Sequence, residues 1–261
     1  MKNREAFLSA AKKTHIFTAK AEKICELNFP SPLFRGFQGG CSDGSRHYYQ
    51  IVMHYDFPDR LRDYGRIAKV DLQTGRAVKW SNDLYLDHAN DMTYLPHRHQ
   101  ILVSHNKPNP CRLSVLDADT LEVIGRTELP FPVYAIDYNA KRQQFVVGLS
   151  GKREFRFLNA DLTPREERTY RTSPETDRYT KQGIGSDEDL LYFILWDGKH
   201  KDAPDFQNTI ALYDWEGNDR GRIDFNVGVQ EPENISMANG KILAICGHTH
   251  PILYHLDPIL P

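Results

Sequence analysis

The chain carries the same short pattern five times: a strand-like run that ends in Asp or Asn, then a turn, then a second strand-like run. The residues that close the first run are Asp71, Asp117, Asn159, Asp214 and Asp257. Successive closing residues are 46, 42, 55 and 43 positions apart. A period in the forties with several short strands per repeat is typical of a β-propeller blade. The repeat therefore predicts an all-β fold, a five-bladed β-propeller, over almost the whole chain.

The fifth repeat lacks one strand. Each of the other repeats divides into four runs rich in β-branched and aromatic residues. After the fifth closing residue only residues 258–261 remain, and they are too short and too rich in proline for another strand. Residues 23–29 have the missing pattern, and a strand there would close the ring and remove two exposed sheet edges. We therefore expect residues 15–261 to form one propeller domain, and residues 1–14 to form an extension outside the ring with a short helix.

The composition argues against several classes of binding partner. The net charge is −2 and no long basic run is present, which argues against nucleic acid or an anionic membrane as the main partner. No apolar run approaches the roughly 18 residues of a membrane span, and the N-terminus lacks the apolar segment of a secretory signal. The four cysteines are scattered, as free thiols in a reducing cytoplasm would be. We expect a cytoplasmic monomer that binds a small molecule or a glycan.

The innermost strands of the repeats carry polar residues at one level. Gln38-Gly-Gly-Cys-Ser-Asp43 matches Gln182-Gly-Ile-Gly-Ser-Asp187, and the other inner strands can be placed in the same register. That level is occupied by Gln38, Asn90, Tyr134, Gln182 and Glu233. Because the inner strand of a blade lines the central channel, these side chains are expected to form a polar ring around the axis. His88, Asp91 and Glu231 come next to it in the sequence.

Histidines recur in the loops that follow the second strand of the repeats. These loops contain His54, His105, His248 and His250, and the fourth one begins at Trp196. If the loops open on the same face as the polar ring, histidines and carboxylates converge in one cavity, which is the default position of a functional site. His248 and His250 are spaced to bring two imidazoles to one ion. A divalent metal ion held by His54, His105, His248 and His250 is therefore one hypothesis.

The residue types favour acid–base chemistry. No GxSxG, P-loop, GxGxxG or HExxH motif is present. Glu231 and Glu233 point to the same side of an extended strand, where repulsion raises the pKa of one of them. The leading hypothesis is a small-molecule hydrolase, lyase or isomerase in which His88 and Glu233 transfer protons. Asp91 and Glu231 are further catalytic candidates, and the candidates for substrate binding are Gln38, Asn90, Tyr134, Gln182 and Trp196.

Other interpretations stay open. Tyr55, Tyr134, Tyr179 and Trp196 could stack on sugar rings in a non-catalytic module that binds a glycan or a peptide. A pure interaction scaffold would use the outer blade faces instead. Polar side chains also line many propeller channels only because water fills them. The Asp and Asn residues that close the repeats are assigned to the turns, where a short polar side chain caps its own backbone.

Two inner-strand segments carry a family resemblance. Residues 88–94, His-Ala-Asn-Asp-Met-Thr-Tyr, and residues 230–235, Gln-Glu-Pro-Glu-Asn-Ile, resemble segments of uncharacterised bacterial five-bladed propellers, including helveticin-like proteins. Five-bladed glycosidases such as the arabinanases carry catalytic carboxylates on the inner strands of their first three blades. At those places this chain has Gln38 and Tyr134, with Asp137 on the other side of its strand, so the resemblance does not extend to that mechanism.

Overall fold

Strands dominate the computed structural model, which describes residues 4–13, 15–27, 36–54 and 64–260. Three sheets follow the chain in order. The first consists of β2 (Gly36–Ser42), β3 (His47–His54), β4 (Tyr64–Asp71) and β5 (Arg76–Trp80), with β6 (Leu84–Tyr85) paired to β4. The second consists of β7 (Asp91–Leu95), β8 (Gln100–Ser104), β9 (Arg112–Asp117) and β10 (Val123–Glu128). The third consists of β11 (Val133–Asn139), β12 (Gln144–Leu149), β13 (Glu154–Asn159) and β14 (Tyr170–Arg171).

The remaining strands form one eight-stranded sheet. A short 3-10 helix, η1 (Pro174–Thr176), precedes it. The first half of the eight-stranded sheet consists of β15 (Thr180–Ser186), β16 (Leu190–Trp196), β17 (Asn208–Asp214) and β18 (Asp219–Phe225). Its other half is β19 (Pro232–Ala238), β20 (Lys241–Cys246) and β21 (Ile252–Ile259), and β1 (His15–Glu26) lies between β18 and β21.

The N-terminal strand joins the two ends of the chain. β1 runs antiparallel to β21, from Thr18 opposite Ile259 to Glu26 opposite Ile252. It also runs parallel to β18, from His15 to Ala19. The prediction that an N-terminal strand pairs with the last strand is therefore confirmed. The strand begins at residue 15 rather than 23, and residues 28 and 29 of the predicted segment lie outside the described residues.

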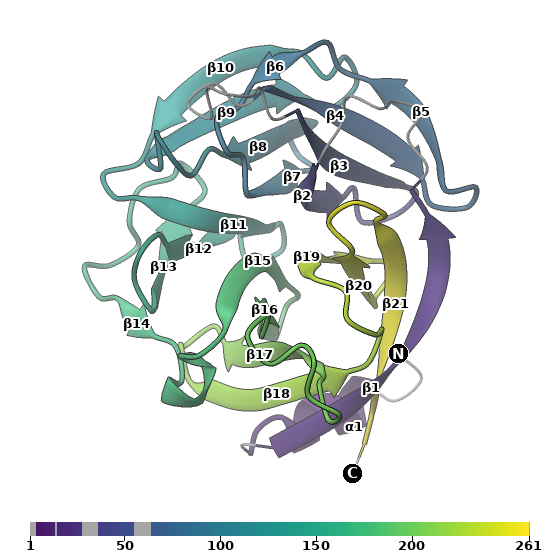
Figure 1. The fold of residues 1–261 in the computed structure, drawn as a ribbon. Helices are drawn as coiled ribbons and strands as arrows, with labels where there is room; N and C mark the ends of the chain where they lie inside the picture. Colours follow the sequence, from purple (N-terminus) through teal and green to yellow (C-terminus); the bar gives the residue numbers. More distant parts are fainter. Residues whose placement is uncertain (1–3, 14, 28–35, 55–63, 261) are drawn as a thin grey trace.

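The innermost strands enclose the axis of a propeller-like ring (Figure 1). Contacts run in the cyclic order β2, β7, β11, β15 and β19, and β19 returns to β2. Backbones approach closely at the centre, so that a Cβ atom on Gly39 would lie 2.5 Å from the carbonyl oxygen of Asn90. Only glycine fits at such a distance, and the sequence has a glycine directly after both Gln38 and Gln182.

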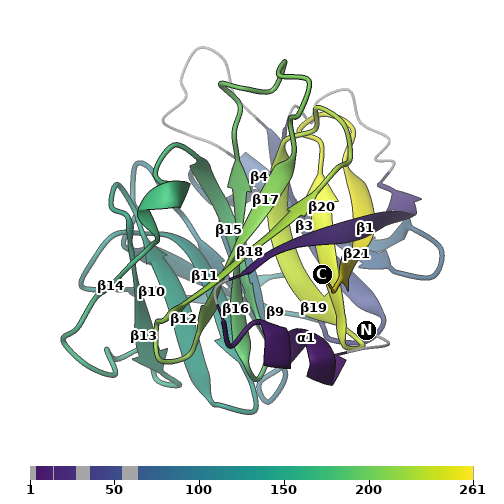
Figure 2. The ribbon, with the colours of Figure 1, turned by 90° about the horizontal axis from the view of Figure 1, so that it is seen from below.

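The apolar core lies between neighbouring sheets. One cluster joins β15–β18 with β19–β21 and includes Ile194, Ile223 and Ile242, each fully buried. Helix α1 (Arg4–Ala10) adds Phe7 to this cluster, with its ring centroid 5.0 Å from that of Phe17 in an edge-on contact. Figure 2 shows α1 and β1 along the outside of this part of the ring. The N-terminal segment therefore contributes apolar surface to the core although it lies outside the strands.

The turn assignment is confirmed for three of the closing residues, Asp71, Asp117 and Asp214, and is wrong for Asp257, which lies within β21 opposite Lys20. The Oδ1 atom of Asp71 accepts from the backbone N–H groups of Gln73 and Thr74 at 2.9 and 3.0 Å. Asp117 and Asp214 cap the equivalent turns in the same way. All four cysteines are free, as expected. In the part of the chain that the structure describes, no helix is long and apolar enough to cross a membrane.

Candidate functional site

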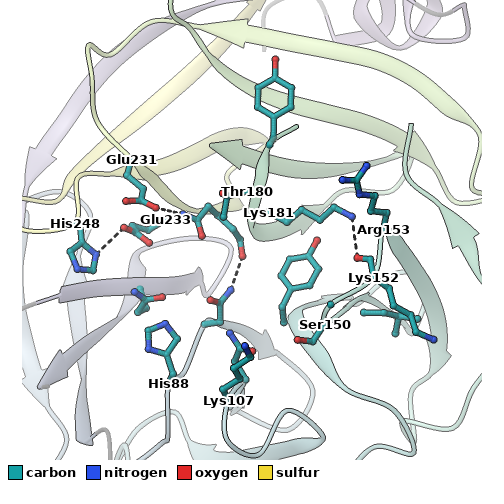
Figure 3. A pocket seen from close by; sticks show the side chains of 18 of the residues that line it. His88, Lys107, Ser150, Lys152, Arg153, Thr180, Lys181, Glu231, Glu233 and His248 are labelled. Carbon is teal, nitrogen blue, oxygen red and sulfur yellow. Dashed lines mark hydrogen bonds and ion pairs between the residues drawn. The ribbon is translucent and has the colours of Figure 1, made fainter. Parts of the chain in front are cut away.

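A cavity of about 680 Å³ lies over the inner strands. The residues predicted at one level all line it: Gln38, Asn90, Tyr134, Gln182 and Glu233. His88, Glu231 and His248 also line it, and Figure 3 shows His88, Glu231, Glu233 and His248 on one side. The structure thus brings residues from distant parts of the sequence into one polar cavity, as the register of the repeats predicted.

Irregularities in the inner strands expose these side chains. The pairing of β2 with β3 shifts between Phe37 and Gly40, at Gln38. Corresponding shifts occur at Tyr134 in β11, between Lys181 and Ile184 in β15, and at Glu233 in β19. A β-bulge turns a side chain out of the regular alternation and is common beside functional sites. The bulges therefore explain how residues of buried strands reach the cavity.

Glu233 is the most strongly perturbed acid of the cavity. Its side chain is only 3% exposed, and its Oε1 atom lies 3.1 Å from Nδ1 of His248. Burial raises the pKa of Glu233 to about 7, and the charge of Glu231 adds to the rise. The hydrogen bond with Glu233 raises the pKa of His248 in turn. The pair can therefore hold or release a proton near neutral pH, which is what acid–base catalysis requires.

The neighbouring polar residues are held by specific hydrogen bonds. Nε2 of Gln182 donates to Oε1 of Glu231 at 2.6 Å. Nδ2 of Asn90 donates to the backbone oxygen of Gln182 at 2.9 Å. These bonds connect β15 with the segments before β7 and β19, so they hold the side chains of Asn90, Gln182 and Glu231 in place.

The Glu233–His248 pair predicts a pH-dependent stability. Both groups have a raised pKa in the folded protein, so their contribution is fully present below about pH 4.5 and is lost as the pH rises through about 7. Gln at position 233 lacks this dependence. The Tm of Glu233→Gln relative to the wild type is expected to increase between about pH 5 and pH 8. Thermal unfolding of both proteins across this range measures it, and a constant difference would contradict the pair's role.

His105 does not reach the cavity. It is fully buried, with Nδ1 2.7 Å from Oδ2 of Asp87 and Nε2 2.7 Å from Oγ of Ser114. Asp87 has a φ of 54°, in the left-handed region, and also accepts a hydrogen bond from Asn109. The hydrogen bond with the buried carboxylate of Asp87 keeps the His105 side chain in the interior. The Asp87–His105 pair thereby anchors the loop that carries His88 and Asn90.

Three other predicted site residues lie elsewhere. Asp91 is fully buried and binds the backbones of the inner strands, so it does not line the cavity. Trp196 packs edge-on against Phe206 and is also absent from the cavity wall. His250 is exposed and does not line the cavity. The sequence interpretation was wrong about these positions because neither a place on a strand, as for Asp91 and Trp196, nor a place in a loop, as for His250, decides where a side chain turns.

Among the described residues, the predicted histidines do not come together as a metal site. His248 lines the cavity, while His105 and His250 point elsewhere, and the side chain of His54 lies outside the described residues, as does Tyr55. Over the described ranges, no group of three His, Cys, Asp or Glu side chains is placed to hold one ion. Asp137, which the sequence placed on the other side of its strand, is half-buried, accepts hydrogen bonds from Thr93 and Ser186, and lines a separate cavity.

The sequence interpretation missed a group of basic residues. Lys107, Lys152, Arg153 and Lys181 line the cavity, together with Tyr179. The motif Gly151-Lys-Arg153 in a loop was a signal for two of them. Lys181 gave none, because strict alternation places it and Gln182 on opposite faces of a strand. The shift in pairing that follows Lys181 is what admits both side chains to the cavity.

Comparisons with known proteins indicate the fold. No family model matches the sequence, and no curated protein matches it significantly. The structure is similar to that of Myxococcus xanthus glutaminyl cyclase, with a TM-score of 0.63 and 12% identity over 94% of this chain and 98% of that chain. Streptogramin B lyase gives a TM-score of 0.49 and 14% identity over 92% and 98% of the two chains. The β-propeller domain of Cps50 (Swd1) from Myceliophteria thermophila gives 0.44 and 10% over 87% and 65%. At these identities the likeness concerns the fold alone, which is all-β and propeller-like.

Proposed function

We propose that the protein is an enzyme that transfers a proton to or from a small molecule bound in the axial cavity. The observation that carries the proposal is the buried carboxyl group of Glu233, whose pKa of about 7 matches the operating range of a general acid or base. The reaction class is a hydrolysis, an elimination or an isomerisation, since each can proceed by proton transfer with no organic cofactor.

The neighbours of Glu233 supply supporting roles. His248 orients the carboxyl group and shares its proton. His88 lines the same side of the cavity and is the second group for proton transfer. Gln38, Asn90, Tyr134 and Gln182 offer hydrogen bonds to a bound molecule. Glu231 fixes Gln182 and keeps the proton affinity of Glu233 high by its charge.

The fold is compatible with this function. We infer five blades, in which β1 is the outer strand of the blade formed by β19, β20 and β21. The antiparallel pairing of β1 with β21 and the cyclic contacts of the inner strands support this count. A glutaminyl cyclase has a similar fold, so an arrangement of this kind is able to carry an enzyme.

A binding module for a glycan or a peptide is the second candidate. Tyr134 and Tyr179 line the cavity and offer aromatic faces to a bound ring. Such a module would bind its ligand without changing it. Both the wild type and Glu233→Gln would then bind the ligand saturably, and neither would form a product.

The test of catalysis follows solvent deuterium. The purified protein is incubated in D₂O with a pool of small carboxylates and phosphates, and mass spectrometry records exchange, loss of water or addition of water. Each reaction class above leaves one of these traces. Glu233→Gln is expected to slow the reaction about 100-fold or more, because an amide cannot exchange the proton.

Controls separate chemistry from folding. Glu122→Gln makes the same change at an exposed residue that does not line the cavity, and it is expected to leave the rate unchanged. Equal rates for the wild type and Glu233→Gln would remove Glu233 from the mechanism. Binding of a pool member without any reaction would favour the binding module.

A further inference from the structure

The cavity has a second, oppositely charged side. Lys107 follows β8, Lys152 and Arg153 lie in the connection between β12 and β13, and Lys181 belongs to β15. Figure 3 shows Lys152, Arg153 and Lys181 across the cavity from Glu231, Glu233 and His248, with Lys107 beside His88. We call these four residues the basic wall. A cavity with cations on one side and carboxylates on the other orients any molecule that carries unequal charge.

Most of this positive charge has no protein partner. Arg153 forms an ion pair with Asp177, which also lies 3.8 Å from Arg171. The amine of Lys181 donates to neutral oxygens, the hydroxyl of Thr172 at 3.2 Å and the carbonyl of Lys152 at 3.3 Å. Within the described ranges no carboxylate lies within ion-pair distance of Lys107, Lys152 or Lys181. Asp177 and Glu154 act on Lys181 only from beyond ion-pair distance, so among these four residues Arg153 alone has a direct carboxylate partner in the described part of the chain.

The charge of Lys181 lies in an unfavourable position. Its side chain is partly buried on an inner strand, directly before Gln182. Burial and, to a smaller extent, the charge of Arg153 lower the pKa of Lys181 to about 8, against the opposing charges of Asp177 and Glu154. A charged amine that is partly removed from water and lies near another cation is unfavourable unless a negative charge compensates for the lost hydration and the repulsion. An anion placed between Lys152, Arg153 and Lys181 would relieve both effects.

We propose that the basic wall is a binding site for the anionic group of the substrate, a carboxylate or a phosphate. The substrate is then a small anionic metabolite whose charged group contacts Lys152, Arg153 and Lys181, while its reacting part extends toward Glu233. The placement of the reacting part rests on the proposed function. Binding of the anionic group does not, because it needs no chemistry.

The test uses two simple anions, inorganic phosphate and malonate, and measures their binding to the whole protein by titration calorimetry near pH 7. The wild type is expected to bind at least one of them with a Kd in the millimolar range. Lys181→Met removes the charge and keeps the length of the side chain, and it is expected to weaken binding about tenfold or more, equal to about 1.4 kcal/mol. Lys152→Ala, at an exposed turn, provides a second variant that does not disturb an inner strand.

Two controls make the result specific. Lys241→Met changes an exposed lysine that lines a different cavity, and it is expected to bind as the wild type does. Glu233→Gln is expected to bind the anions at least as tightly as the wild type while losing turnover, so failure of the proposed function can be told from failure of the anion site. The proposal would be overturned if the wild type bound neither anion. It would also be overturned if Lys181→Met and Lys152→Ala both bound the anions as tightly as the wild type does.

Discussion

Removal of residues 1–26 is expected to abolish cooperative folding. These residues contain β1, which pairs with β21 from Thr18 to Glu26 and with β18 from His15 to Ala19. Without β1, the facing edges of β18 and β21 lose their hydrogen-bond partners, and unpaired strand edges promote association between chains. Phe7 and Phe17 leave the core at the same time. Size-exclusion chromatography with light scattering, together with urea unfolding followed by circular dichroism, measures the outcome.

A shorter deletion provides the comparison. Removal of residues 1–13 takes away α1 but leaves β1 intact, so the fold is expected to persist with lower stability. Loss of the buried Phe7 side chain alone corresponds to about 1.5–3 kcal/mol. A soluble, monomeric and cooperatively unfolding product from the deletion of residues 1–26 would show that β1 does not close the ring.

Asp91→Ala is expected to destabilise the protein by about 3–5 kcal/mol without a direct effect on the cavity. The carboxylate of Asp91 accepts four hydrogen bonds at the centre of the ring. Its Oδ1 atom accepts from Met92 N at 2.9 Å and from Nδ2 of Asn234 at 2.6 Å. Its Oδ2 atom accepts from the backbone N–H groups of Ile136 and Ile184, each at 3.2 Å. Burial raises the pKa of Asp91, and the three backbone donors oppose that rise.

The conservative variants sharpen this prediction. Asp91→Asn places an NH₂ group against fixed N–H donors, and we expect a loss of about 2–4 kcal/mol. Asp137→Asn is the comparison, because Asp137 is only half-buried and its main donors, ahead of two backbone N–H groups, are the hydroxyls of Thr93 and Ser186, which can rotate to accept instead. Its expected loss is about 1 kcal/mol or less. Urea unfolding of the three variants measures these differences, and an Asp91→Asn protein as stable as the wild type would refute the role of Asp91.

Much of the architecture could be predicted from the sequence because it depends on local, repeated features. Asp71, Asp117 and Asp214 cap turns within four positions of themselves, so their role is visible in a short window. The incomplete last repeat indicated a partner strand at the N-terminus, since a missing strand leaves an unpaired edge. The common level of Gln38, Asn90, Tyr134, Gln182 and Glu233 followed from the alignment of equivalent strands.

Only the tertiary structure decided where individual side chains turn. His105 and His248 occupy similar loops, yet His105 is drawn inward by the buried carboxylate of Asp87, while His248 meets Glu233 in the cavity. Lys181 lines the cavity beside Gln182 because the pairing of β15 shifts just after it, and a shift of one residue reverses the face of a strand. Asp91 sits one residue beyond Asn90, yet it binds the other inner strands instead of facing the cavity. These outcomes depend on bulges and long-range partners, which no local pattern encodes.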